Sequence, residues 1–231
     1  MDSTGEGSNM FTHNVGQRST AVGTGRAPTM RASGRVTAWR GVDLITAAMV
    51  AVTFGVVFWG FDTFVYPGVS AVTAGFPPAG ELALGVWLVP AVVGGLIVRR
   101  PGAALLTELV AANIELFLGN QWGIAVLLSG ALQGLGVEMV LALLFWRRFG
   151  GIVAVLGGVM AAVLEIVGYE WWSYAAGYSW TWRIVYLICG MASGGLIAGL
   201  GGWALVRSLA RTGALNAFPP GQEIREKDLV H

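Results

Sequence analysis

Long apolar runs bounded by arginines constrain this sequence more than any other feature. The clearest example is residues 99–148, RRPGAALLTELVAANIELFLGNQWGIAVLLSGALQGLGVEMVLALLFWRR, which have an arginine pair at each end and a short turn at 119–123. About 20 residues of helix cross the hydrocarbon core of a bilayer. Each half of the stretch approaches or exceeds that length, so the sequence predicts a hairpin of two membrane-spanning helices.

Four more apolar runs surround the hairpin, and together they predict an all-α integral membrane protein with a bundle of six transmembrane helices. The composition agrees, because 55% of the residues are hydrophobic and 12% are charged, about half the charge of a soluble domain. The many glycines and alanines favour close packing of helices. The expected spans are 42–61, 81–98, 101–118, 123–146, 150–169 and 183–206.

Arginines at the ends of the predicted spans orient the chain. With six spans, four arginine clusters fall on the same side of the membrane, whereas the loops of the other side hold Arg183. Cytoplasmic loops carry an excess of Lys and Arg, so both termini are predicted to be cytoplasmic. The clusters are Arg31, Arg35 and Arg40; Arg99 and Arg100; Arg147 and Arg148; and Arg207 and Arg211.

Three segments follow from this topology. Residues 1–40 are rich in Gly, Ser, Thr and Arg without periodicity, which predicts a disordered cytoplasmic tail. Residues 41–207 form the predicted six-helix transmembrane domain, and residues 208–231 form a second cytoplasmic tail.

The outer side carries loops at 62–80, 119–123 and 170–182. Prolines and glycines break the first loop, which predicts an irregular or re-entrant segment and not a span. Trp and Tyr gather at membrane interfaces whatever the function, but four tryptophans in the third loop exceed that need. The outer aromatic residues are Tyr66, Trp122, Trp171, Trp172, Tyr174, Tyr178, Trp180 and Trp182.

Composition and motifs exclude several kinds of function. A net charge of +1 gives no basic surface for nucleic acid. Both histidines lie in the tails, which excludes a histidine metal site within the membrane, and the single Cys189 excludes an internal disulfide. The sequence holds no phosphate-binding loop and no nucleophile–base pair, so we expect neither an enzyme nor a cofactor.

Acids and amides inside the apolar runs are the first candidate site residues. Such groups are expensive in hydrocarbon and face a protein interior or a wet cavity. Glu108 and Glu115 are seven residues apart and share one helix face, while Gln133 and Glu138 lie on the next span. For Glu108 and Glu138 a structural role in tying helices together is equally plausible, whereas Glu115 and Gln133 favour a ligand role.

Two further acids, Glu81 and Glu170, stand where spans meet the outer loops. Buried carboxylates next to aromatic faces suit a cationic heteroaromatic ring, through stacking and cation–π attraction. The candidate substrate-binding residues are Glu81, Trp87, Glu108, Glu115, Asn120, Trp122, Gln133, Glu138, Tyr169, Glu170, Trp171 and Trp172.

The first span carries small residues at Ala47, Ala51 and Gly55, spaced four apart on one helix face. Small residues at this spacing let another helix approach closely. That helix could belong to the same chain or to a partner subunit, and the sequence leaves both open.

Several motifs within residues 43–207 together point to a known family. They are R-P-G-A-A at 100–104, Glu108, Glu115, Gly119-Asn120, Q-G-L-G-x-E at 133–138, F-G-V-V at 54–57, Glu81-Leu82, Gly85 and Trp87. In combination they resemble the YkoE family of substrate-binding (S) components of energy-coupling factor (ECF) transporters. The resemblance implies a six-helix S component for thiamine or its hydroxymethylpyrimidine precursor in a bacterial-type plasma membrane. It also implies a transmembrane T component, docked at Ala47 and Ala51, and two ABC ATPase subunits.

Two alternatives remain at this stage. One is an S component for another vitamin or heterocyclic ligand. The other is a small polytopic membrane assembly factor or enzyme, which the absence of catalytic pairs disfavours.

The predicted topology is testable by cysteine labelling of intact cells in a Cys189→Ala background. Ser70→Cys and Ala176→Cys should react with an impermeant maleimide from outside, because both lie in predicted outer loops. Phe149→Cys should react after permeabilisation. External labelling at position 149 would contradict the six-span topology.

Overall fold

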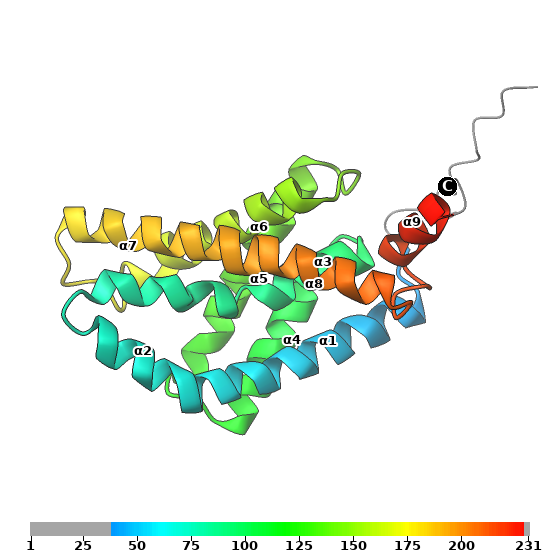
Figure 1. Cartoon of the computed structure of the whole chain (residues 1–231). Coiled ribbons are helices and arrows are strands. Elements are labelled where there is room, and N and C mark those ends of the chain that lie inside the picture. The colour runs from blue at the N-terminus through cyan, green and yellow to red at the C-terminus, as the bar shows by residue number, and fades with distance from the viewer. Residues whose placement is uncertain (1–37, 229–231) are drawn as a thin grey trace, which may run out of the picture. The chain divides into compact units, whose positions relative to one another are not determined.

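A computed structural model describes residues 38–228, and all its regular elements are helical (Figure 1). The prediction of an all-α chain therefore holds for the described residues. The predicted tail 1–40 lies almost wholly outside them.

The first helix is longer than the sequence predicted. Helix α1 (Gly41–Gly60) passes through a π-helical turn, η1 (Phe61–Val65), into α2 (Tyr66–Thr73), which makes one helix of 33 residues. The prediction of a loop beginning at residue 62 was therefore wrong. Pro67 lies in the first turn of α2, where its missing N–H is tolerated, and the wider turn before it absorbs the change of hydrogen-bonding pattern.

The chain reverses after α2 and returns antiparallel to it (Figure 1). The returning segment is a 3₁₀ helix, η2 (Pro77–Val86), followed by α3 (Val89–Val98). Ser193 fixes η2 from a distant helix, because its hydroxyl donates to the carbonyl of Leu82 at 2.7 Å and accepts from the amide of Gly85 at 2.8 Å.

The predicted central hairpin is present. Helix α4 (Ala103–Leu118) is followed by a 3₁₀ turn, η3 (Gly123–Ala125), and by α5 (Val126–Leu143), and the two helices pack against each other. Helix α4 begins at Ala103 and not at Pro101. Helix α6 (Gly151–Glu165) and its π-helical extension η4 (Ile166–Glu170) come next.

The last long helix runs for 32 residues through α7 (Trp180–Ser193), the π-helical η5 (Gly194–Gly201) and α8 (Gly202–Arg211). Ser179 caps its N-terminus by accepting from the amide of Trp182 at 3.4 Å. Trp180 and Trp182 are therefore helical and not part of the predicted loop 170–182. A short helix, α9 (Pro219–Asp228), follows, and Leu215 and Phe218 before it are buried in the core.

Among residues 38–228, five helical segments are long and apolar enough to cross a membrane, so the chain is a multi-pass membrane protein. Helix α4 is apolar but has 16 residues, and the six-helix count stays a prediction. The five segments are Gly41–Thr73, Pro77–Val98, Gly123–Leu143, Gly151–Glu170 and Trp180–Arg211.

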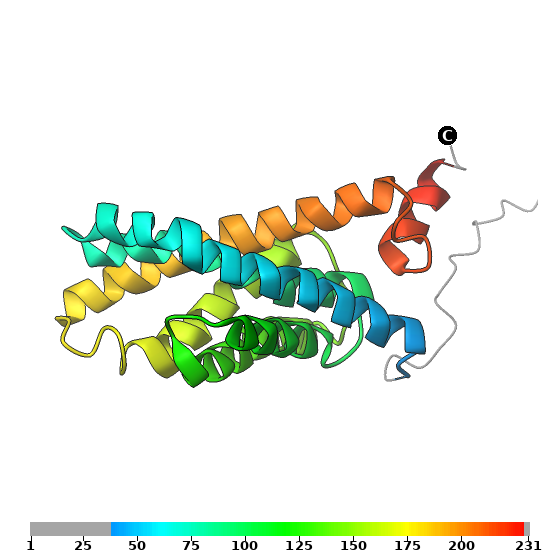
Figure 2. The same ribbon diagram turned by 90° about the horizontal axis from the view of Figure 1, so that it is seen from below.

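Arginine contacts join several helix ends at one end of the bundle. Asp43 in α1 pairs with Arg40 at 2.7 Å and lies 3.7 Å from Arg100, which precedes α4. Arg99 stacks on Phe149 at 4.6 Å, which adds the turn between α5 and α6 to the same end. Figure 2 shows that the start of α1 (blue), the end of α8 (orange) and α9 (red) lie at the same end of the bundle.

The small-residue face of α1 is buried inside the chain. Ala47 and Ala51 are at most 1% exposed, and α1 packs mainly against α4. At Gly55 a Cβ atom would lie 2.5 Å from Cβ of Ile114 and 2.8 Å from the carbonyl oxygen of Ala111. In this conformation the face serves internal packing, and its docking to a partner stays a prediction.

Gly55→Leu should therefore destabilise the fold, because the added side chain collides with α4. Overpacking of this kind costs at least about 1–3 kcal/mol, so we expect a lower melting temperature in detergent. Val56→Leu is the matched control, since Val56 is 48% exposed. Equal melting temperatures for the two variants would contradict the close contact between α1 and α4.

Candidate functional site

A cavity of about 490 Å³ opens among the helices, at the end of the bundle opposite the arginine contacts that join the helix ends. That is the range typical of small-molecule sites. Its lining comes from α2, η2, the α4–α5 turn, α5, α6, η4, the following turn and α7. The lining residues are Tyr66, Ser70, Thr73, Ala74, Pro77, Gly80, Glu81, Leu84, Trp87, Gln121, Trp122, Val126, Ser129, Gln133, Glu165, Glu170, Tyr174, Tyr178 and Tyr186.

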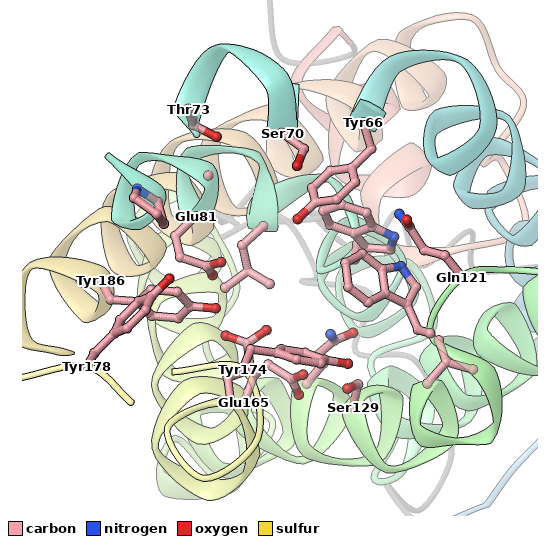
Figure 3. A pocket seen from close by; sticks show the side chains of 18 of the residues that line it. Tyr66, Ser70, Thr73, Glu81, Gln121, Ser129, Glu165, Tyr174, Tyr178 and Tyr186 are labelled. Carbon is pink, nitrogen blue, oxygen red and sulfur yellow. The ribbon is translucent and has the colours of Figure 1, made fainter. Parts of the chain in front are cut away.

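Three glutamates make one side of this cavity acidic. Glu165 and Glu170 are 1% and 6% exposed, and Glu81 is partly buried. The Oε2 atom of each is buried without a hydrogen-bond partner among the described residues. A buried carboxylate oxygen without a hydrogen-bond partner is costly, so the arrangement favours a ligand that supplies positive charge or hydrogen-bond donors. Figure 3 shows Glu81 and Glu165 directed at the same space.

Tyrosine hydroxyls surround these acids. Tyr186 lies beside Glu81 and Glu170, and the rings of Tyr178 and Tyr186 pack 6.0 Å apart. Burial raises the pKa of the Tyr174 phenol above its ordinary value, and the neighbouring Tyr169 adds to that shift. The Tyr174 hydroxyl is therefore neutral near pH 7.

An aromatic wall stands opposite the acids. The ring of Tyr66 lies edge-on to Trp87 at 5.4 Å and to Trp122 at 5.3 Å. Tyr174 extends the cluster, with its ring 5.5 Å from Trp122. In Figure 3, Tyr66 and Gln121 project from the side facing Tyr178 and Tyr186. Such a wall can stack on a flat heterocycle and attract a cation through its ring faces.

The polar side chains of α5 complete the cavity. Ser129 and Gln133 are four residues apart, one turn of helix, and both line the same space. Their hydroxyl and amide groups both donate and accept hydrogen bonds, which suits a ring with mixed nitrogen donors and acceptors.

The structure brings five of the sequence-predicted residues to the cavity: Glu81, Trp87, Trp122, Gln133 and Glu170. They come from four different parts of the chain. The fold therefore brings together residues that are far apart in the sequence.

Glu108 and Glu138 lie away from the cavity and tie helices together. Glu108 is fully buried and accepts from the amide of Ala91, at the start of α3, at 2.8 Å. Glu138 accepts from the amide of Ala104 at 2.8 Å and from the indole of Trp146 at 3.2 Å. The structural alternative left open by the sequence accounts for both residues.

Glu115 and Asn120 do not line the cavity either. Glu115 is fully buried and adjoins Asp62 of η1. The side-chain oxygen of Asn120 accepts from the amides of Trp122 at 2.8 Å and Gly123 at 2.6 Å. Asn120 therefore shapes the turn that presents Trp122.

Three predicted aromatic residues point elsewhere. Trp171 packs on Trp180 at 5.9 Å, and the indole of Trp172 donates to the carbonyl of Val167 at 2.8 Å while remaining 65% exposed. Tyr169 packs on Tyr174 and touches the site through it. Because Glu170 faces inward on this helical segment, its immediate neighbours face other directions.

Part of the cavity lining was not predicted from the sequence. Tyr66, Ser70 and Thr73 were placed in a loop, although they project from the helix α2. Glu165 was not singled out, and the available signal was a lone acid near the end of an apolar run. Tyr186 and Ser129 had no distinguishing pattern.

Comparisons with known proteins agree with this architecture. A family model described as "ABC-type cobalt transport system, permease component" matches residues 42–164. A protein of Bacillus subtilis (strain 168), provisionally named HMP/thiamine permease protein YkoE, is 34% identical over 191 residues, covering 82% of this chain and 94% of the relative. A structure described as "Crystal structure of an S-component of ECF transporter" has a TM-score of 0.76 and 33% identity, covering 83% of this chain and 95% of that chain.

The fold and these matches define an S component of an ECF transporter, which is a transport subunit and not an enzyme. More narrowly, the chain belongs to the YkoE family of S components. The resemblance found in the sequence is thereby confirmed.

The structural role of Glu108 predicts a stability effect. Glu108→Ala leaves the buried amide of Ala91 without its acceptor, which should lower the free energy of unfolding by about 1–3 kcal/mol. Thermal unfolding in detergent measures this, with Glu226→Ala on the exposed surface of α9 as control. A melting temperature equal to that of the control would exclude Glu108 as a tie between α3 and α4.

Proposed function

We propose that this S component binds thiamine or its hydroxymethylpyrimidine precursor in the 490 Å³ cavity. The observation that carries the proposal is the set of buried glutamates with unbonded oxygens facing an aromatic wall. The name of the Bacillus subtilis relative supports the same ligand class.

Thiamine fits this chemistry in both of its rings. Its thiazolium carries a permanent positive charge, which Glu81, Glu165 and Glu170 would neutralise. Its aminopyrimidine needs donors and acceptors, which Ser129 and Gln133 offer from α5. Tyr66, Trp87 and Trp122 provide faces for stacking.

The precursor presents the pyrimidine without the fixed charge. Because the acidic side of the cavity gains most from a full positive charge, we propose that thiamine binds more tightly than hydroxymethylpyrimidine. A titration with both compounds decides between them.

We further propose six membrane spans with both termini cytoplasmic. The support is geometric: arginine-bearing helix ends gather opposite the cavity, and positive residues favour the cytoplasmic side. Helix α4, with 16 residues plus its flanking turns, would be the sixth span. The cavity would then open outward from the plasma membrane, on the side from which a vitamin arrives.

The proposed transport cycle needs partners, as in other ECF systems. A transmembrane T component and two ABC ATPase subunits would supply the driving force. Residues 41–207 would be the substrate-binding domain in this assembly, between cytoplasmic segments 1–40 and 208–231. The apolar surface of the helices would contact the lipid bilayer.

Calorimetric titration of thiamine into purified variants tests the site. Glu165→Gln should weaken binding by about 1.5–3 kcal/mol, because the ligand loses its hydrogen bond to a charged carboxylate. Trp122→Ala should cost about 1–2 kcal/mol through lost stacking and cation–π attraction. Glu138→Gln is the matched acid outside the cavity and should leave the affinity unchanged.

Two results would contradict the proposal. One is unchanged affinity in both Glu165→Gln and Trp122→Ala. The other is a loss with Glu138→Gln as large as that with Glu165→Gln, which would indicate a general effect of removing buried acids. Native mass spectrometry of the purified chain identifies the molecule that it carries.

A further inference from the structure

A second cavity, of about 220 Å³, lies at the arginine-bearing end of the bundle. It is formed where the end of α3, the start of α6, the last turns of α8 and the helix α9 meet. Arg99 and Arg207 line it together with Phe149, Trp203 and Glu223. It shares no residue with the cavity proposed to bind the vitamin.

Two guanidinium groups are held at the walls of this cavity by aromatic rings. Arg99 lies 4.6 Å from the ring centre of Phe149, and its Nε donates to the carbonyl of Leu96 at 3.1 Å. Arg207 lies 5.0 Å from the ring centre of Trp203. Stacked guanidinium groups keep their in-plane N–H donors available for carboxylate or phosphate oxygens.

The lining of this cavity contains two arginines but one acid, Glu223. Glu223 of α9 pairs with Arg99, with its Oε2 3.2 Å from Nη2. Within residues 38–228, Arg207 makes no ion pair. The pair is bidentate, and the Glu223 side chain is 55% exposed whereas that of Arg99 is 16% exposed. Because the carboxylate is open to solvent and comes from the short helix α9, another anion can compete with it for Arg99.

The surroundings of the cavity are those of a membrane interface. Trp203 is an amphipathic ring of the type that anchors helices there. Ile152 and Leu205, each next in sequence to a lining residue, are apolar and 79% and 38% exposed. Helix α6 begins after Gly150, which has no side chain to cap the first amides. The positive end of the helix dipole therefore adds to the charge of the two arginines.

We propose that this cavity binds the phosphate of an anionic phospholipid, with Arg99 and Arg207 as its ligands. Basic pockets between helices on the cytoplasmic side hold anionic headgroups, and the exposed apolar neighbours would contact the acyl chains. Glu223 then acts as a competing internal anion, so lipid binding and the docking of α9 through Arg99 exclude each other. A soluble phosphate has the same headgroup chemistry, but it gains nothing from the apolar surface.

Native mass spectrometry of the full chain, released from nanodiscs, tests this. The nanodiscs contain equal amounts of phosphatidylglycerol and phosphatidylcholine with identical acyl chains. The wild-type chain should retain phosphatidylglycerol in preference. Arg207→Gln should reduce that retention about tenfold, the effect of roughly 1.4 kcal/mol from one charge-assisted hydrogen bond. Arg211→Gln removes the same charge one turn along α8 but outside the cavity, and should retain the lipid.

Two additional arms keep the test decisive. Glu223→Gln should increase phosphatidylglycerol retention, because it removes the competing carboxylate, and it does not depend on the arginine variants folding. Inorganic phosphate should not displace the lipid at equal concentration. Equal losses in Arg207→Gln and Arg211→Gln, no effect of Glu223→Gln, or displacement by inorganic phosphate would each overturn the proposal.

Discussion

The need to satisfy buried carboxylates within apolar surroundings governs this structure. Glu108 and Glu138 accept hydrogen bonds from backbone amides at the starts of neighbouring helices, and so connect α3, α4 and α5. Glu165 and Glu170 line the cavity instead, and each has a buried oxygen there without a partner among the described residues. The first pair holds the bundle together, while the second leaves a demand for positive charge that a ligand can meet.

Irregular helical segments lie next to the cavity that these acids line. Glu170 is the last residue of the π-helical η4, and η1 leads directly into α2, whose Tyr66 enters the cavity. A π-helical turn shifts the angular position of the residues that follow, which is why such turns recur at functional sites. The 3₁₀ helix η2 supplies Glu81, beside Glu170, and is held by Ser193. The cavity is thus lined by α-helical residues together with the non-α segments that adjoin them.

Much of the fold follows from patterns that the sequence displays openly. Apolar runs predicted the helices, and the motifs at 100–138 predicted the family. The helix boundaries were harder to predict: prolines and glycines at 67–80 favoured a loop, but one π turn lets the helix continue to Thr73. The candidate site was likewise predictable in part. Glu81, Trp87 and Trp122 could be found from charge and aromatic content. Tyr66 and Glu165 could not, because their places in the site depend on which face of a helix they occupy in the structure.

The sequence by itself determined a multi-pass helical S component, because hydropathy and motif spacing are local properties of the chain. It also supplied the acids and aromatic residues that a cationic ring requires. The tertiary structure decided which of them meet. Glu108 and Glu115 are seven residues apart on one face of α4, yet neither lines the cavity. The element that packs against each acid decides whether it meets a backbone amide, another acid or an open space.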